Sequence, residues 1–421
     1  MRAYRRLFVL GLAAVASLAP AWPEEPSSAF TLPELQALAR AAQPTLESAE
    51  AAIEAAEGAL RQARAYPNLE LVVGGGRGRP RDGGDSKSET VIELVQPIEL
   101  PGLRRWRARA AEVRLEGAAI DRDVVDAVVD STVARLVYET LLAERQADIA
   151  RGSAAIALRL QELLERRVEI GESAPLDAVK ARSEGFARRR EVLEAERSLE
   201  ASRAALSLMC GDRLPVGFRL ADTLEDPGAT PLPNDLAERL RNGNPILRRA
   251  RNAVEEALAR TEVARKEVFP GFDLLAGHET ELDRSATNVG VGITLPLWNR
   301  NGGAIAEAGA ESTRAEADVR ALTRELETAL VQAGAAYRAA LAEIELHEQG
   351  WTEAAKKSLD IATFGFENGE ASILDVLDAQ RSYLGVSLAE AESWAGLALA
   401  RTDIERLIAG PLNPESTDET R

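Results

Sequence analysis

Hydrophobic positions follow a helical spacing along most of the chain and change to strand-like alternation in two short regions. Residues 31–66 show the helical spacing, with Leu32 and Leu35 on one stripe. In residues 68–97 and again in 272–298, apolar residues alternate with polar or small ones on both sides of a polar loop. Each of these two regions therefore predicts a pair of strands.

Long helical patterns follow each strand pair. The predicted helices run over 103–166, 175–209, 303–365 and 372–408. At a rise of about 1.5 Å per residue, the longest would reach on the order of 90 Å if unbroken. Helices of that length exceed what a globular domain contains. We therefore expect them to lie side by side in a bundle or tube.

The second half of the chain repeats the order of elements in the first half about 199 residues later. Gly171 in GESAPLDAVKAR corresponds to Gly369 in GEASILDVLDAQ, and Gly211 corresponds to Gly410. Solenoid repeats are about 20 to 50 residues long, so this unit is a duplicated element of domain size. The sequence therefore predicts a pseudo-symmetric pair within one body.

The predicted organisation has five parts. They are a secretory leader at 1–21, a first repeat at 22–210, a crossover rich in proline and glycine at 211–233, a second repeat at 234–410 and a polar, disordered tail at 411–421. The leader has a basic start, an apolar run and the cleavage sequence Ala19-Pro20-Ala21. The alternative is a helical anchor, but the apolar run is shorter than the roughly 20 residues that span a bilayer.

Composition limits the possible partners. Aromatic residues make up only 4% of the chain and alanine is abundant, which favours closely packed helices over a broad globular core. The formal net charge of −17 does not suit binding to nucleic acid, and it favours cations in any enclosed lumen. Cys210 is the only cysteine, so no intrachain disulfide forms, and no cysteine near the leader offers a site for lipid attachment.

The strand pairs have the length of strands that cross a bilayer at the tilt of a barrel. Ordinary surface hairpins are the alternative. Four strands cannot close a conducting barrel alone, but a cyclic trimer would combine twelve. Because no other stretch is apolar enough for a spanning helix, we expect strands to make any membrane crossing. In that arrangement Glu70, Glu93 and Asp273 face the lumen, since the opposite register would place carboxylates in lipid.

Four segments resemble the TolC-type outer-membrane efflux proteins: VQPIELPGLRRWRARAAE, TLPLWNRNGGAIAEAGAE, RVEIGESAPLDAVKAR and FENGEASILDVLDAQRSYL. The first two resemble the heavy-metal (CzcC-like) branch of the family, whereas the last is shared by the wider family. The resemblance covers nearly the whole mature chain. It implies a fold that is mainly α with a small β part: a homotrimer with a twelve-stranded β-barrel in outer-membrane lipid and a twelve-helix α-barrel in the periplasm. The implied partners are a periplasmic adaptor (membrane fusion) protein and an inner-membrane pump of the resistance-nodulation-division (RND) class.

Asp375 and Asp378 lie three residues apart at the start of a predicted helix, so they share one face. One interpretation is simple stabilisation of the helix start by negative charge. The resemblance instead implies rings of carboxylates at the periplasmic mouth, which would hold cations and raise some of their pKa values. Asp177 and Lys180 occupy the equivalent positions in the first repeat.

The turns between the long helices are expected to be the tips that dock to the adaptor. Their candidate residues are Gly171, Glu172, Ser173, Gly369, Glu370 and Ser372, and the two serines are also candidate N-caps. In the archetype of the family, a tyrosine and an arginine in the second turn help to lock the closed mouth. Phe366 and Ala371 stand at those positions, so we expect a different or weaker lock.

Ligands for a transition-metal site are sparse. His278, His347 and Cys210 are far apart in the sequence, whereas such a site needs three or four clustered ligands. No catalytic constellation, cofactor motif or phosphate-binding loop is present in the sequence. We therefore predict no resident metal, no cofactor and no enzymatic activity.

Three functions remain open at this stage. The first is a passive outer-membrane export channel for heavy-metal cations. The second is a channel of the same kind for organic drugs or solvents, because tunnel sequences encode little about cargo. The third is a periplasmic coiled-coil scaffold without a pore, against which the leader and the amphipathic strands argue.

Overall fold

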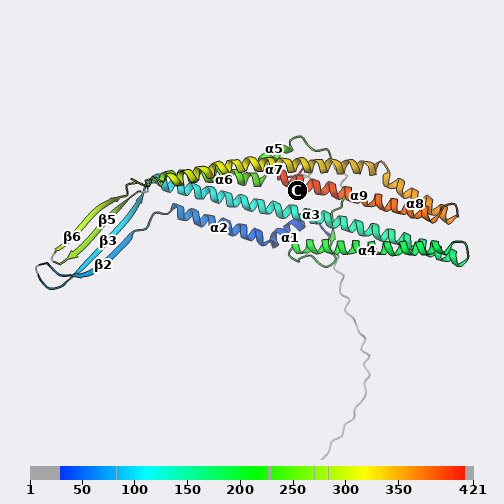
Figure 1. Ribbon diagram of the computed structural model, residues 1–421, viewed down its shortest axis with the longest axis horizontal. Helices are drawn as coiled ribbons and strands as arrows, with labels where there is room; N and C mark the ends of the chain where they lie inside the picture. The colour runs from blue at the N-terminus through cyan, green and yellow to red at the C-terminus, as the bar shows by residue number, and fades with distance from the viewer. Residues whose placement is uncertain (1–28, 82, 226–229, 270, 283, 413–421) are drawn as a thin grey trace, which may run out of the picture.

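The computed structural model describes residues 29–412 except 82, 226–229, 270 and 283. The molecule is long and mainly helical, with a four-stranded sheet at one end and two helix-to-helix turns at the other (Figure 1). This confirms the expected class, mainly α with a small β part. The predicted leader at 1–21 and residues 413–421 of the predicted tail lie outside the described residues.

The elements follow the same order in both halves, except that α7 and α8 of the second half correspond to the single helix α3 of the first. The helices are α1 Leu32–Ala42, α2 Pro44–Arg64, α3 Pro101–Glu169, α4 Pro175–Met209, α5 Leu236–Gly243, α6 Pro245–Lys266, α7 Gly302–Glu348, α8 Trp351–Glu367 and α9 Ile373–Ile408. The strands are β1 Ala29–Phe30, β2 Glu70–Gly78, β3 Lys87–Glu99, β4 Arg219–Leu220, β5 Gly271–Glu281 and β6 Arg284–Ile293.

Two predicted helical stretches are each divided in two. Pro44 lacks an N–H and holds the preceding residue in an extended conformation, so α1 ends at Ala42 and α2 begins at Pro44. A single helix over 303–365 was wrong, because Gly350 adopts a left-handed conformation with φ +100 between α7 and α8. By contrast α3 continues for 69 residues.

The sheet joins the strand pairs of the two repeats in the order β2-β3-β5-β6, and every pairing in it is antiparallel. β3 and β5 connect the repeats, with Glu93 opposite Gly277 and Leu94 opposite Ala276. β2 and β6 form its two edges. β1 and β4 make a separate short parallel pair.

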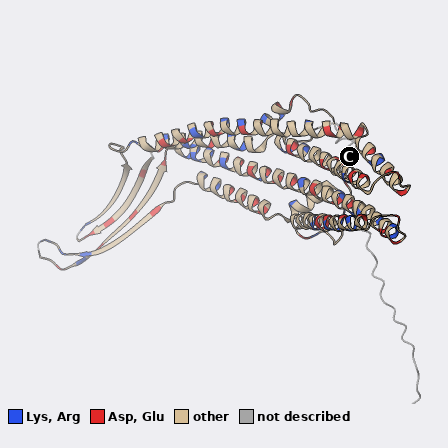
Figure 2. Cartoon of the chain, turned by 45° about the vertical axis from the view of Figure 1, so that its right-hand side comes forward, with Lys and Arg blue, Asp and Glu red and all other residues tan. Residues whose placement is uncertain are grey.

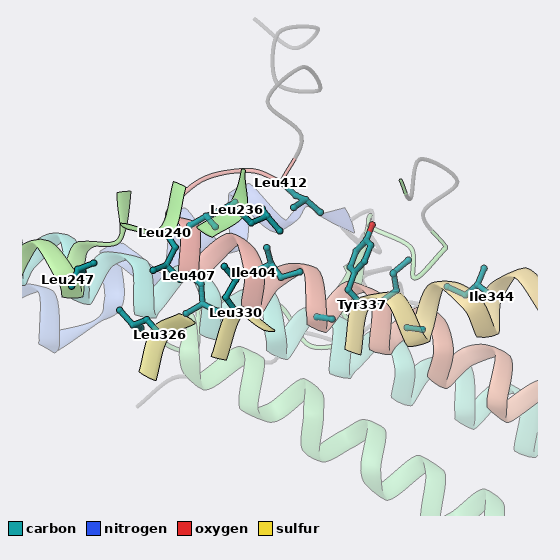
Figure 3. Packing of buried hydrophobic residues seen from close by; sticks show 14 residues of the cluster. Leu236, Leu240, Leu247, Leu326, Leu330, Tyr337, Ile344, Ile404, Leu407 and Leu412 are labelled. Atoms are coloured by element: carbon teal, nitrogen blue, oxygen red, sulfur yellow. The ribbon is translucent and has the colours of Figure 1, made fainter. Parts of the chain in front are cut away.

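Buried apolar side chains form clusters along the helices instead of one central core. In the second repeat, Leu240, Leu247 and Leu407 belong to a cluster that packs α5, α6, α7 and α9 (Figure 3). A corresponding cluster in the first repeat packs α1, α2 and α3 against the end of α4. A third cluster joins α3, α4, α8 and α9 near the two turns. Burial of this apolar surface is the main stabilising contribution.

Charged side chains are spread along the helices (Figure 2). Some link neighbouring helices, such as Arg135 to Asp403 at 2.9 Å and Arg248 to Asp123 at 2.9 Å. These pairs are partly exposed, and such pairs contribute only about 0–1 kcal/mol each. None of the described helices has an apolar stretch long enough to cross a membrane.

Candidate functional site

The two turns between the long helices have the same backbone geometry. Gly171 after α3 and Gly369 after α8 are left-handed, with φ +81 and +79. Each glycine N–H donates to the carbonyl three residues back, at 3.1 and 3.2 Å. The next N–H, that of Glu172 or Glu370, donates to the carbonyl five residues back, at 2.8 and 2.7 Å. Together these bonds form a Schellman motif at each turn, which satisfies carbonyls at the helix ends.

We expect Gly369→Val to destabilise the second turn by about 1–2 kcal/mol, because a branched side chain disfavours the left-handed conformation. A Cβ there would meet no atom within 4 Å, so only the backbone conformation requires glycine. Faster amide hydrogen exchange around the turn would show the effect. Gly385→Val in α9 is the matched control, since Gly385 also has open space but no positive φ. Equal exchange at the turn in the two variants would contradict this account.

The helices that follow the two turns begin differently. Ser372 is the N-cap of α9, as predicted, and its hydroxyl accepts a hydrogen bond from the N–H of Asp375 at 3.3 Å. The Asp375 carboxylate accepts from the Ser372 N–H at 2.8 Å and from its hydroxyl at 2.7 Å. The prediction of Ser173 as an N-cap was wrong. Ala174 holds that position, because Pro175 is favourable as the first residue of α4.

Asp375 and Asp378 are both exposed on α9, three residues apart. The Ser372 hydroxyl, and after it the Ser372 backbone N–H, hold the pKa of Asp375 below its ordinary value. The cap therefore stabilises α9 at neutral pH and is lost as the pH falls through this lowered pKa. Crowded carboxylates would shift a pKa upward instead. Capping thus accounts for Asp375 within one chain, and a ring that needs three chains stays a prediction.

The first repeat carries a different charge pattern at the equivalent place. Asp177 lies in the first turn of α4, and its carboxylate is 3.7 Å from the ammonium nitrogen of Lys180. An acid paired with a base contributes little net charge. The start of α4 therefore carries less net charge than the start of α9, where Asp375 and Asp378 lie.

Arg167 connects the two turns, and the sequence analysis missed it. From the last turn of α3, its guanidinium donates to the carbonyl of Phe366 at 3.0 Å and to that of Glu367 at the end of α8. It also lies 5.0 Å from the centre of the Phe366 ring. Phe366 is 6% exposed, and a Cβ on Gly365 would lie 3.2 Å from that of Ala371. In this chain the two turns are thus held together by a base from the first repeat.

A second charged contact, between α4 and α9, was also missed. The carboxylate of Glu184 lies 2.6 Å from Arg188 and 3.1 Å from Arg381. Burial by itself would raise the pKa of Glu184, but the hydrogen bonds from Arg188 and Arg381 outweigh it and hold the pKa below its ordinary value. Glu184 and Arg188 are largely buried on α4, but the Arg381 side chain is 60% exposed, so the link to α9 is a partly exposed ion pair that contributes about 0–1 kcal/mol.

The two faces of the sheet differ in chemistry. Directly paired residues of an antiparallel sheet lie on the same face, so the register places Glu70, Glu93 and Asp273 on one face. The other face carries exposed apolar side chains: Leu71, Val73, Ile92, Leu94, Phe272, Leu274, Val289, Val291 and Ile293. The three predicted carboxylates therefore share a face, and its role as the wall of a lumen stays a prediction.

Glycines lie opposite carboxylates on this acidic face. Asp273 pairs with Gly292 and Glu89 pairs with Gly76. A Cβ on Gly292 would be 3.6 Å from Asp273 Oδ2, and one on Gly76 would be 3.7 Å from Glu89 Oε2. The carboxylates thus lie over the neighbouring strand, in the space that a side chain at each glycine would otherwise occupy. The sequence analysis missed Glu89, although it lies four residues before Glu93 and so shares its alternation.

Potential metal ligands lie on separate elements. Nδ1 of His278 in β5 is 3.0 Å from the hydroxyl of Thr287, and Nδ1 of His347 in α7 is 2.9 Å from that of Thr352. Cys210 is buried, and burial raises the pKa of its thiol. Within the part of the chain that the structure describes, no three His, Cys, Asp or Glu side chains are grouped to hold a metal ion.

Comparison with known proteins agrees with this architecture. Residues 35–212 and 236–410 both match the outer membrane efflux protein (OEP) family. The cobalt-zinc-cadmium resistance protein CzcC of Cupriavidus metallidurans is 31% identical over 379 residues, which covers 88% of this chain and 89% of that protein. The toluene efflux pump outer membrane protein TtgF of Pseudomonas putida is 28% identical over 240 residues, which covers 53% of this chain and 49% of that protein.

A solved structure of CusC has the same fold, with a TM-score of 0.78 and 20% identity over 90% of this chain and 92% of that one. Each repeat thus has its own match to one family, which explains the duplicated order of helices and strands. The chain belongs to the outer membrane efflux protein family.

Proposed function

We propose that this outer-membrane protein is the channel of a tripartite efflux assembly, through which heavy-metal cations leave the cell envelope passively. The similarity to CzcC over most of both chains supports metal cations as the cargo. The chemistry that selects the metal belongs to the pump, because this chain offers few soft or imidazole ligands. We assign the protein no enzymatic role.

The four-stranded sheet is the observation that carries the proposal. One face is apolar and exposed, the other carries carboxylates, and β2 and β6 are edges. An edge with unpaired backbone groups is stable in lipid only if it is paired. Three copies would pair the edges into a closed barrel of twelve strands, with the apolar face toward lipid and Glu70, Glu93 and Asp273 toward the lumen. The protein would therefore work as a homotrimer.

The two turns are the proposed docking tips for a periplasmic adaptor, which would connect the channel to an inner-membrane pump of the RND class. They lie at the end of the molecule farthest from the sheet (Figure 1). The docking residues would be Gly171, Glu172 and Ser173 of the first turn and Gly369, Glu370 and Ser372 of the second. Their two Schellman motifs present matching backbone shapes to the adaptor.

An organic solvent is the alternative cargo, which the similarity to TtgF over about half of each chain supports. Deletion of the gene in its own host distinguishes the metal-cation hypothesis from the organic-solvent hypothesis. Lower growth in cobalt, zinc or cadmium salts, with unchanged growth in toluene, would support metal export. The reverse pattern would assign the channel to solvent efflux. Complementation with the intact gene is the control.

The acidic pair on α9 gives a prediction about conduction. If three chains bring Asp375 and Asp378 into rings, Asp375→Asn with Asp378→Asn should lower cation selectivity and weaken block by divalent cations in planar bilayers. If Asp375 serves only as a cap, the same change should leave conductance unaltered and cost roughly 0.3–1 kcal/mol of stability. Asp148→Asn is the matched control, because Asp148 is an exposed acid on α3, away from the turns. Unaltered selectivity and block would remove the pair from the mouth.

Arg167 gives a prediction about the closed state. Arg167→Gln should remove the hydrogen bonds to the end of α8, so we expect the two turns to separate more often and the channel to be open for a larger fraction of the time in planar bilayers. Bonds to charged groups contribute about 1.5–3 kcal/mol each when buried, and less at this partly exposed place. Arg166→Gln is the control, because the Arg166 guanidinium donates to the Glu162 carbonyl of its own helix and not, among the described residues, to the end of α8. Identical opening in both variants would contradict the role of Arg167.

A further inference from the structure

A cavity lies between α3 of the first repeat and α9 of the second, where the two helices contact each other. Its volume is about 270 Å³. Sites for drug-sized ligands have volumes of about 300–1,000 Å³, so this cavity suits a smaller molecule. Its walls combine apolar side chains with hydroxyl and amide groups, among them Ile149, Ser153, Gln380, Tyr383, Leu384 and Ser387. Each repeat therefore contributes one wall.

Two buried polar side chains in the α9 wall have unused hydrogen-bonding groups. Gln380 is 2% exposed, and its amide nitrogen donates to the Ser153 carbonyl at 2.9 Å. Its amide oxygen has no hydrogen-bond partner among the described residues. Ser387 is 8% exposed, and its hydroxyl makes no hydrogen bond within the described part of the chain. By contrast, the Ser393 hydroxyl on the same helix donates to the Ala389 carbonyl at 2.8 Å.

Gly152 leaves room on the α3 side of the cavity. It lies in the interior of a 69-residue helix, where glycine is less favourable than alanine. A Cβ on Gly152 would meet no atom within 4 Å, so no close neighbour excludes a side chain there. Helix propensity and packing would thus both accept a larger residue, whereas glycine keeps the space open.

The cavity suits an uncharged ligand. Arg145 and Asp148 also line it, but both are exposed and opposite in charge, so they supply no buried counter-charge. An ionised ligand would exchange water for apolar walls such as Ile149 and Leu384, which is unfavourable. The Tyr383 ring favours an aromatic partner, since aromatic pairs gain more than their buried area provides.

We propose that the cavity between α3 and α9 binds a small uncharged phenol. The ligand hydroxyl donates to the Gln380 amide oxygen and accepts from the Ser387 hydroxyl, so both unused groups gain a partner. The ring packs against Ile149, Leu384 and Tyr383. Because its walls come from both repeats, the bound phenol holds α3 and α9 at one spacing. This site goes beyond the export function and needs only one chain.

Amide hydrogen exchange of the full mature chain in detergent provides the test, with para-ethylphenol as the probe. The matched compound is para-ethylanisole, whose methyl ether has no proton to donate. We expect the phenol to slow exchange in residues 145–156 and 380–387, which form the two walls. A ligand that binds only the closed helices slows exchange about twofold at a concentration equal to its Kd, and about tenfold at ten times that concentration. The ether should slow it much less.

Three variants locate the site. Ser387→Ala should bring the effect of the phenol close to that of the ether, because one of its two hydrogen bonds is lost. Gly152→Leu should abolish protection by both compounds, because the new side chain occupies the cavity. Ser202→Ala is the matched control, since the Ser202 hydroxyl donates to the Ser198 carbonyl of its own helix, α4. Each variant is compared with and without the probe, so a change in helix stability cancels.

The outcomes decide both the place and the class of ligand. Equal protection by the phenol and the ether would overturn the assignment of a phenol. Protection spread over all helices, or equal in the unchanged chain and Gly152→Leu, would show an effect of the probe on the detergent and overturn the site. No protection in either wall at millimolar phenol would overturn it as well. None of these results bears on metal export, which the growth experiment tests separately.

Discussion

Val291→Arg is expected to abolish recovery of the protein from the outer membrane, although Val291 is 61% exposed in a single chain. On the surface of a water-soluble protein this exchange would change stability by less than about 0.5 kcal/mol. On the lipid face of a barrel, an arginine costs about 2–4 kcal/mol near the middle of the bilayer. A trimer would carry three of them. The measurement is the amount of folded trimer in the outer-membrane fraction.

Asn288→Arg is the matched control for this experiment. Asn288 lies on the same strand, β6, but the register places it on the acidic face opposite Gly277. An arginine there would face the proposed lumen, where carboxylates lie nearby, so normal recovery is expected. If Asn288→Arg were lost and Val291→Arg recovered, the two faces of the sheet would have to exchange their assignments.

Gly271→Ala is expected to disrupt the junction between the two repeats. Gly271 begins β5 with φ +147, and a Cβ on it would lie 2.1 Å from the carbonyl oxygen of Ile98 in β3. Backbone strain of this kind costs about 1–3 kcal/mol, and the overlap with a backbone atom adds to it. The midpoint of unfolding in denaturant should fall, together with the fraction of protein that folds into vesicles.

Gly277→Ala tests whether any added methyl group in β5 has the same effect. A Cβ on Gly277 would lie 3.5 Å from the Ile92 carbonyl oxygen, which is an ordinary contact. We therefore expect a change within about 0.5 kcal/mol. Equal losses in the two variants would show that the close approach at Gly271 is not the cause.

The positions of the helices and strands could be predicted from the sequence, because they depend on the pattern of neighbouring residues. The expected helix 175–209 coincides with α4, and 372–408 differs from α9 by one residue at its start. We expected Glu93 and Asp273 to share a face because carboxylates are unfavourable in lipid, and the register places them on one face. These predictions succeed because the periodicity of strands (two residues) and of helices (3.6 residues) depends only on residues close together in the sequence. The conformational effects of glycine and proline are local in the same way.

Local competition between neighbouring residues was harder to predict. A lone glycine in a helical pattern is usually tolerated, so Gly350 did not reveal the break between α7 and α8. Ser173 looked like an N-cap, yet Pro175 fixes the first turn of α4 and moves the cap to Ala174. In both cases two local preferences compete, and periodicity alone does not show which of them prevails.

The sequence by itself determined the helices, the strands, their duplication and the candidate acids of the sheet and the turns. Only the tertiary structure showed that Arg167 binds the end of α8, since its partner Phe366 is 199 residues away. The same holds for Glu184 with Arg381 and for Tyr66 with Arg104. Periodicity specifies which side of an element is buried, but it carries no information about which distant element packs there. The partners of these charged side chains are therefore decided by the packing of distant helices, which only the tertiary structure shows.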